Sequence, residues 1–329
     1  MKLLVSGYYG FGNLGDEALL AGLLTGLEAH AVTVLSGRPG DTRALHGVGT
    51  AHRLRGLPAL MHHDALLSGG GGLLQDKTSA RSLRYYLGVI ALAKRLGKRV
   101  VVYGQSVGPL SPEGRRAVAR TLRGVPVAVR DGASQRLLAG LGVRAALAAD
   151  AALLLPKPAP RSTDPVPPDG APVLLVPRGG YPQVTAALAR LAAALHAEGV
   201  ALAGLALHPS EDAGALAELP PAVRRLSAPT PQAVLELVAG SRYVVSARLH
   251  GLILAARAGR PFSGVAYDPK VAAFLAEAGG RVHPVPPDPE VLMQEVFNPV
   301  FDVNRVAALE ARARGGLTWL EAALSAPAR

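Results

Sequence analysis

The chain has 329 residues, more than the usual single-domain range, so its length predicts two domains. Apolar residues make up 49% of it and charged residues 18%, which excludes a disordered chain and allows hydrophobic cores. The net charge of +11 favours acidic ligands, and the absence of cysteine excludes disulfides, thiolate metal sites and cysteine nucleophiles.

The first half of the chain alternates short apolar runs with longer stretches of helical spacing. We expect strands at Leu3–Ser6, Val32–Ser36, Ala65–Ser68, Arg99–Tyr103 and Val125–Arg130. We expect helices at Glu17–Ala29, Arg81–Leu96, Glu113–Leu122 and Ala133–Leu141. Parallel strands need crossover connections, so this alternation predicts an α/β domain with a parallel sheet. The apolar start Met1–Ser6 is too short for a signal peptide, and no run of 18 apolar residues occurs, so we expect a soluble, cytoplasmic protein.

A proline-rich segment separates the two halves. Seven prolines lie between residues 156 and 172, and because proline donates no backbone hydrogen bond, this segment predicts a linker. The alternation then restarts with strands expected at Val173–Pro177, Val200–Leu207, Val223–Ser227, Tyr243–Ser246 and Phe262–Ala266. Helices are expected at Pro182–Ala197, Pro231–Ala239, Leu249–Ala258, Pro269–Ala278 and Val303–Leu324.

The predicted organisation is therefore two Rossmann-like α/β domains facing a central cleft, where the carboxyl ends of both sheets would meet. We assign residues 1–155 to an N-terminal domain with glycine-rich loops and residues 156–172 to the linker. Residues 173–302 form the second domain, and the C-terminal helix within 303–329 packs back on the first domain.

A glycine-rich loop follows the first strand. Gly10–Gly15 matches the dinucleotide fingerprint G-x-G-x-x-G, but Asp16 and Glu17 stand at the helix start, where they would repel a diphosphate. The end of the next strand, Leu35–Arg38, contains no acidic residue that could bind a ribose, so NAD is disfavoured. Asp16 and Glu17 are explained either as helix caps or, for Asp16, as a functional carboxylate beside Tyr8, Tyr9 and Asn13.

Two more glycine-bearing turns follow predicted strands. Four consecutive glycines, Gly69–Gly72, lead toward Gln75, and Gly104–Pro109 contains Gln105. Consecutive glycines weaken helices and strands, so they are typical of close backbone approach to a ligand or of an anion-binding loop; a plain flexible loop is the alternative. Together the three turns predict a ligand-lined edge with Gly71, Gly72, Gln75 and Gln105 as contacts.

Basic side chains follow the strands of the second half. Arg178 follows the first of these strands, Arg248 and His250 stand where a strand enters a helix, and Lys270 follows Tyr267 and Asp268. A cation in a first helical turn opposes the helix dipole, so helix stability does not explain Arg248, whereas a bound anion does. A surface salt bridge for Arg248 and a buried structural role for His250 are the alternatives. We expect one anion site formed by Arg178, Arg248, His250 and Lys270.

Other ligand classes have less support. No H-x-x-x-H or clustered-carboxylate pattern occurs, so no metal site is predicted. The basic residues are scattered and no nucleic-acid motif is present, so nucleic acid is disfavoured as a partner.

In combination these motifs resemble the polysaccharide pyruvyltransferase family, CsaB type. The matching stretches are Gly7–Ala18, Gly69–Ser79 with Arg81 and Ser82, Gly104–Pro109, Arg130 and Asp131, Ser246–Ile253 and Tyr267–Lys270. The resemblance implies a glycosyltransferase-B-like fold and transfer of a pyruvyl group from phosphoenolpyruvate to a sugar, forming a pyruvate ketal and releasing phosphate. For the CsaB type the sugar is N-acetylmannosamine of a cell-wall polysaccharide, whose ketal carboxylate anchors surface-layer (S-layer) proteins.

The resemblance also implies roles for individual residues. Arg248 and His250 correspond to phosphoenolpyruvate contacts, with a looser match at Arg178, and Lys270 completes the site. We expect His250 to be the general acid that protonates C3 of the enol, with Asp16 or Asp131 as the base for a sugar hydroxyl. The acceptor contacts are expected at Tyr8, Tyr9, Asn13, Gly71, Gly72, Gln75, Gln105 and Tyr267. Phosphoenolpyruvate is a co-substrate, so no cofactor is expected.

Two other functions fit the same residues. A nucleotide-sugar-dependent glycosyltransferase of the same fold would use the cations for a diphosphate, and a non-catalytic phosphate-ligand binding protein of a wall-assembly complex would use them without turnover. In the preferred interpretation the partners are phosphoenolpyruvate and a polysaccharide or lipid-linked saccharide acceptor. The basic charge also allows peripheral association at the inner membrane face.

Overall fold

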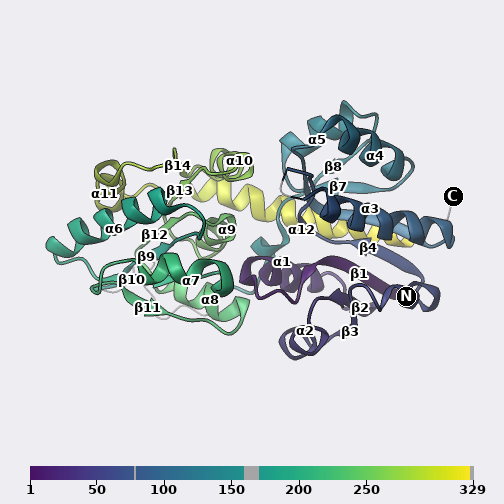
Figure 1. Cartoon of the computed structure of the whole chain (residues 1–329), viewed down its shortest axis with the longest axis horizontal. Helices are drawn as coiled ribbons and strands as arrows, with labels where there is room; N and C mark the ends of the chain where they lie inside the picture. The colour runs from purple at the N-terminus through teal and green to yellow at the C-terminus, as the bar shows by residue number, and fades with distance from the viewer. Residues whose placement is uncertain (78, 159–169, 327–329) are drawn as a thin grey trace. The chain divides into compact units, whose positions relative to one another are not determined.

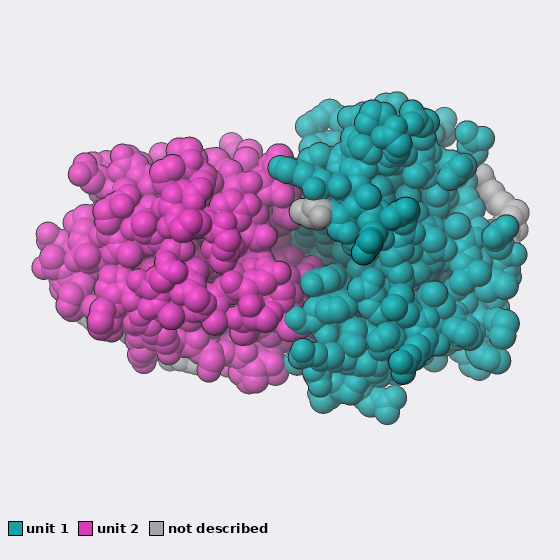
Figure 2. Space-filling view, viewed as in Figure 1, with its two compact units in different colours: residues 1–11, 19–154, 311–329 teal, residues 12–18, 155–310 magenta. Residues whose placement is uncertain are grey.

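The computed structural model describes residues 1–77, 79–158 and 170–326 of the chain (Figure 1). They form two compact units (Figure 2). Unit 1 comprises Met1–Phe11, Leu19–Leu154 and Ala311–Arg329, and unit 2 comprises Gly12–Ala18 and Leu155–Glu310. Residues 159–169, the centre of the predicted linker, lie outside the described residues.

Unit 1 is built on a parallel sheet of eight strands in the order β3-β2-β1-β4-β6-β7-β8, with β5 paired to β6. The strands are β1 (Lys2–Tyr9), β2 (Ala31–Ser36), β3 (Gly49–His52), β4 (Ala65–Ser68), β5 (Gly71–Leu74), β6 (Arg99–Val107), β7 (Val127–Val129) and β8 (Ala146–Leu147). The helices are α1 (Leu14–Leu24), α2 (Pro39–His46), η1 (Leu57–His62), α3 (Ala80–Arg95), α4 (Pro112–Leu122), α5 (Gly132–Ala139) and η2 (Ala151–Leu154).

The strand alternation of unit 1 creates two apolar faces. Leu3 and Val5 of β1 pack in one cluster with Leu20 of α1 and Leu324 of α12 (Val303–Ser325), a helix that begins in unit 2 and ends in unit 1. Leu4 packs in the other cluster, which also contains residues of α3, α4 and α5. Because successive strand side chains point to opposite faces, this pattern requires helices on both sides of the sheet.

Unit 2 has a six-stranded parallel sheet in the order β11-β10-β9-β12-β13-β14. The strands are β9 (Val173–Val176), β10 (Leu202–Leu205), β11 (Arg224–Leu226), β12 (Tyr243–Ser246), β13 (Phe262–Val265) and β14 (Arg281–His283). The helices are α6 (Pro182–Ala197), α7 (Pro209–Ala217), α8 (Pro231–Ala239), α9 (Leu249–Arg257), α10 (Pro269–Ala278) and α11 (Pro289–Phe297). In sequence order this is 3-2-1-4-5-6, the Rossmann arrangement, so the predicted α/β class with two Rossmann-like sheets is confirmed.

The glycine run Gly69–Gly72 is partly strand rather than wholly loop. Gly71 and Gly72 begin β5, and β6 continues through Gln105 to Val107, so the predicted third turn is partly strand. A Cβ at Gly69 would lie 2.4 Å from Oη of Tyr9. The absence of a side chain at Gly69 therefore makes room for the Tyr9 side chain of the protein itself.

Nine elements of the described residues were not predicted: α2, β3, η1, β5, β8, η2, α7, β14 and α11. Helices α7 and α11 both carry a proline at their first position, and an acidic residue follows in the first turn. That combination is a helix-start signal that the sequence does contain. No helix in the described part of the chain is long and apolar enough to cross a membrane.

Candidate active site

The strand order of the second sheet creates a topological switch point between β9 and β12. From β9 the chain continues through β10 and β11 on one side, and from β12 it continues through β13 and β14 on the other. Open α/β sheets bind ligands at the carboxyl ends of such strands. Arg178 follows β9, and Arg248 and His250 follow β12, so these three side chains flank the switch point.

Arg178 is a half-buried cation held by aromatic rings. Its Nη1 donates to Oη of Tyr267 at 3.2 Å, and its guanidinium carbon lies 4.4 Å from the centroid of the Tyr267 ring. Its Nε is buried without a hydrogen-bond partner among the described residues, none of which forms an ion pair with it. Burial raises the pKa of Tyr267 although Arg178 and Arg248 act to lower it, so the phenol stays protonated at neutral pH. Arg178 thus retains both charge and an unused donor.

Arg248 is buried and bound by two carboxylates. Its Nε donates to Oδ2 of Asp212 at 2.9 Å, and its Nη2 donates to Asp212 Oδ1 and to Oε2 of Glu211 at 2.7 Å. Its Nη1 takes part in none of these contacts. Burial alone would raise the pKa of Glu211, but hydrogen bonds and charges from Arg248 and His208 lower it below its ordinary value. Arg248 therefore does form a salt bridge, as the alternative interpretation held, but its pair with Asp212 is buried and does not lie at the surface.

Asp212 is the residue of this site that the sequence analysis missed. It is fully buried, and besides Arg248 it accepts from the backbone N–H groups of Gly179 at 3.1 Å and His208 at 3.0 Å. One carboxylate therefore ties the loop after β9 to the start of α7 and to Arg248. Asp212 stands in the first turn of α7, three residues after Pro209, which is a helix-start pattern, but no local pattern indicates its long-range partners.

His250 lies against the end of the glycine loop. A Cβ added to Gly15 would lie 2.3 Å from Nδ1 and 2.7 Å from Cβ of His250, so only glycine fits beside this ring. The backbone N–H of Leu14 also donates to the carbonyl of Leu207 at 2.9 Å. The segment Gly12–Ala18 consequently belongs to unit 2, and the structure brings His250 and the loop together.

Within that loop Asn13 organises the start of α1. Its Oδ1 accepts from the N–H of Gly15 at 3.1 Å, and its Nδ2 donates to Oδ2 of Asp16 at 2.6 Å. Asp16 is half-buried and Glu17 is buried. Asn13 is thus a helix cap that also orients the Asp16 carboxylate.

Lys270 lies in the first turn of α10, whose cap is Asp268. The ammonium of Lys270 is 3.7 Å from Oδ2 of Asp268, and both side chains are about one-third exposed, at 33% and 30%. The nearby carboxylate compensates part of the Lys270 charge, so Arg178 is the less compensated of these two cations.

At the corresponding edge of the first sheet, several predicted contacts serve the fold. Gln105 is fully buried, and its Nε2 donates to Oγ of Ser68 at 3.1 Å and to the carbonyl of Gly69 at 2.7 Å. Asp131 caps α5, accepting from the N–H of Ser134 at 2.7 Å and from Oγ of Ser106 at 2.7 Å. Gln105 therefore cannot offer its side chain to an acceptor in this structure.

Aromatic rings at this edge divide between core and surface. Tyr9 has no exposed area and packs in the core, which corrects its prediction as an acceptor contact. Tyr8 is half-buried and stacks on Phe11, with ring centroids 4.3 Å apart. Arg53 was not identified from the sequence. Its guanidinium carbon lies 5.4 Å from the centroid of the Phe11 ring and 4.2 Å from the centroid of the Tyr85 ring. Gln75 follows β5 and is half-buried.

The described residues include no group of three or more histidine, cysteine or acidic side chains that could hold a metal ion.

Comparison with solved structures identifies the fold. The chain is similar to HepE of Anabaena in complex with UDP and glucose (14% identity, 97% of this chain and 95% of that chain covered, TM-score 0.59). It is also similar to the UDP-GlcNAc 2-epimerase of Neisseria meningitidis bound to UDP-GlcNAc (11%, 98% and 99%, TM-score 0.60). A third neighbour is a putative UDP-N-acetylglucosamine 2-epimerase of Listeria monocytogenes (10%, 100% and 98%, TM-score 0.63). At these identities the likeness shows a glycosyltransferase-B-like fold.

Comparison of sequences is more specific. No curated protein sequence matches the chain. A family model described as polysaccharide pyruvyl transferase matches residues 13–269. This range includes the segment from Asn13 to Asp16 and, in the second half, Arg178, Asp212, Arg248 and His250; Lys270 lies one residue beyond it.

Proposed function

Because this chain belongs to the polysaccharide pyruvyl transferase family and is a transferase, we propose that it transfers the pyruvyl group of phosphoenolpyruvate to a cell-wall polysaccharide. The acceptor sugar in this proposal is N-acetylmannosamine, presented on the polysaccharide or on a lipid-linked precursor at the inner membrane face. The product is a pyruvate ketal whose carboxylate serves S-layer anchoring.

The observation that carries the proposal is Arg178 at the switch point of the second sheet. It is a half-buried cation with an unused Nε and no carboxylate partner among the described residues. A planar guanidinium in this state favours a phosphate or carboxylate. Phosphoenolpyruvate carries both groups, and Lys270 and Nη1 of Arg248 supply further donors for them.

The reaction needs a proton donor and an acceptor for hydroxyl protons. His250 donates a proton to C3, which becomes a methyl carbon, and C2 becomes electrophilic. One sugar hydroxyl adds to C2, phosphate leaves with the electrons of its C2–O bond, and the second hydroxyl oxygen takes its place. Two hydroxyl protons are lost: one balances the proton gained at C3, and the other leaves on phosphate. Asp16, held by Asn13 in the same unit as His250, is the preferred base, with Asp131 as the alternative.

The acceptor contacts that remain after the correction of Tyr9 and Gln105 are Tyr8, Asn13, Gln75 and Tyr267, together with the backbone of Gly71 and Gly72. The stacked pair Tyr8 and Phe11 offers a flat apolar surface of the kind that suits a sugar ring.

A nucleotide-sugar-dependent glycosyltransferase is the second candidate. It is favoured by the 3-2-1-4-5-6 strand order and by neighbours whose structures hold UDP or UDP-sugars. In that case Arg178 would hold a diphosphate.

Incubating the protein with phosphoenolpyruvate and an N-acetylmannosamine-containing saccharide separates the two. We expect phosphate release that requires the saccharide. Transfer from UDP-sugars without any phosphate release from phosphoenolpyruvate would overturn the proposal.

A further inference from the structure

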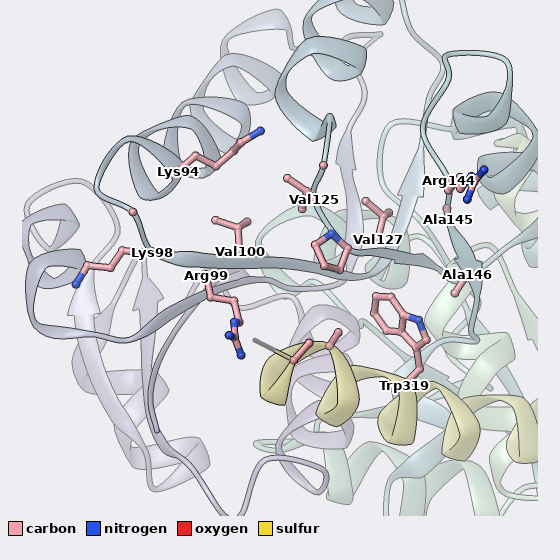
Figure 3. Close-up of a pocket in the computed structure, with 15 residues that line it drawn as sticks. Lys94, Lys98, Arg99, Val100, Val125, Val127, Arg144, Ala145, Ala146 and Trp319 are labelled. Carbon is pink, nitrogen blue, oxygen red and sulfur yellow. The ribbon is translucent and has the colours of Figure 1, made fainter. Parts of the chain in front are cut away.

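A separate cavity of about 820 Å³ lies in unit 1 at the amino ends of strands of the first sheet, opposite the carboxyl ends where the glycine-rich turns lie (Figure 3). It is formed where three helix-to-strand connections enter β6, β7 and β8 and where α12 ends. Because β6 has nine residues and a strand rises about 3.3 Å per residue, its amino end lies roughly 26 Å from its carboxyl end, where the glycine-rich turns are. The cavity is therefore not part of the candidate active site.

The rim of this cavity is cationic. Its charged residues are Lys94, Lys98, Arg99 and Arg144, and none of its fifteen described lining residues is acidic. Lys94 donates to the carbonyls of Thr121 and Arg123 at the end of α4, and Arg99 donates to the carbonyl of Leu324 in α12. The C-terminal end of a helix carries roughly half a negative charge, so the C-terminal ends of α3, α4 and α12 leave more than half of the four positive charges uncompensated.

The interior of the cavity is apolar. Its lining includes Val100, Val125, Pro126 and Trp319. Figure 3 shows Val100, Val125 and Trp319 between Arg99 on one side and Arg144 on the other. Next to the rim, Leu96 is 42% exposed and Met61, whose carbonyl accepts from Nζ of Lys98 at 3.2 Å, is 61% exposed. Exposed large apolar residues beside a basic rim are typical of a membrane-binding surface.

We propose that this cavity and its rim bind an acidic phospholipid surface, with headgroup phosphates on Lys98 and Arg144 and an apolar lipid segment against Trp319. Basic residues near an anionic bilayer are attracted to it, and a tryptophan suits the boundary between headgroups and acyl chains. The proposal stands independently of the reaction at the second sheet.

The test uses Trp319, the only tryptophan of the chain, as a reporter placed in the cavity itself. The full-length protein is titrated with phosphatidylcholine vesicles, with and without phosphatidylglycerol, while sedimentation measures binding and fluorescence follows Trp319. We expect binding and a blue shift with the acidic vesicles only, and quenching when their acyl chains are brominated. The variant Lys98→Gln/Arg144→Gln should lose roughly tenfold or more in affinity.

The matched control is Arg224→Gln/Arg242→Gln, which removes two positive charges from exposed arginines of unit 2 and should bind as the unmodified protein does. If the double variant at Lys98 does not fold, Arg144→Gln alone, at an exposed side chain, is compared with Arg224→Gln. Equal losses in cavity and control variants, or vesicle binding without quenching of Trp319, would overturn the proposal. So would a Trp319 shift with inorganic phosphate in the absence of vesicle binding, which would indicate a site for soluble phosphate.

Discussion

The two sheets have the same strand order around their switch points, but different kinds of side chains lie at the carboxyl ends of their strands. In the first sheet, Gln105 and Asp131 form hydrogen bonds with neighbouring backbone and hydroxyl groups. The rings of Phe11 and Tyr85 lie beside the Arg53 guanidinium. At the edge of the second sheet, Arg178 retains an unused donor and His250 lies at the start of α9. The same architecture thus offers stacking surfaces in one unit and cationic groups in the other, as expected if one edge binds a neutral saccharide and the other a small anion.

The largest effect is expected from His250→Ala at the cationic edge. Loss of a general acid lowers turnover by about 10²–10⁴-fold, while phosphoenolpyruvate affinity changes little because Arg178 remains. Phosphate release and calorimetric binding of phosphoenolpyruvate measure the two quantities. His196→Ala, at an exposed histidine of α6, is the control. Full turnover in His250→Ala would remove this residue from the mechanism.

Gly15→Ala sharpens the comparison without replacing any ionisable side chain. The added Cβ would lie 2.3 Å from Nδ1 of His250, so the ring must move. A displacement of about 1 Å costs up to roughly 100-fold in turnover. The matched control is Gly40→Ala in the first turn of α2, where an added Cβ meets nothing within 4 Å. Unchanged turnover in Gly15→Ala would mean that the position of His250 is unimportant.

Arg178→Gln tests the anion side directly. A hydrogen bond to a charged group contributes about 1.5–3 kcal/mol, so phosphoenolpyruvate affinity should fall roughly 10- to 100-fold. Arg178 is a better probe than Arg248, because removing Arg248 leaves Asp212 buried and unpaired and so destabilises unit 2. An unchanged dissociation constant in calorimetry would contradict the assignment of the anion to this edge.

Arg53→Gln is the corresponding change at the aromatic edge. The variant loses the cation–π interactions of Arg53 with Phe11 and Tyr85, which stabilise the positions of these rings by about 0.5–2 kcal/mol. The KM for the saccharide should therefore rise several-fold while phosphoenolpyruvate affinity stays the same. Steady-state kinetics in both substrates measure this, and a selective loss of phosphoenolpyruvate affinity would reverse the assignment of the two edges.

The smallest effect concerns acid stability. The pKa of Glu211 is lower in the folded protein than its ordinary value of 4.5, so its contribution to stability is present above about pH 4.5 and is lost as the pH falls through the lower, folded value. Because half of the Glu211 side chain is exposed, this contribution is about 1 kcal/mol at most. Glu211→Gln should flatten the loss of stability in acid, measured by urea unfolding between pH 3 and 6. An equally steep loss in the variant would show that other groups account for it.

Much of the fold could be predicted because it depends on local pattern. Apolar runs, helical spacing and turn residues identified the strands β9 and β12, and their ends placed Arg178, Arg248 and His250 correctly at a sheet edge. The burial of Tyr9 was also within reach, since it continues the alternation of Leu3 and Val5 on the core face of β1.

The remaining features depend on tertiary contacts. The pairing of Arg248 with Asp212 joins residues 36 positions apart, and no local signal links them. Gly71 and Gly72 suggested a loop because glycine weakens strands in isolation, whereas β5 is held by its pairing to β6 and by crowding around Gly69. Arg53 was missed because its aromatic partners come from separate parts of the chain.

The most direct test of the account is the fate of C2 of phosphoenolpyruvate. The protein is incubated with phosphoenolpyruvate isotopically labelled at C2 and with an N-acetylmannosamine-containing saccharide, and the product is followed by NMR. We expect a labelled ketal carbon bonded to two oxygens of one sugar, formed at the same rate as phosphate and absent with His250→Ala. Phosphoenolpyruvate that stays intact, or phosphate release that yields only free pyruvate, would contradict it.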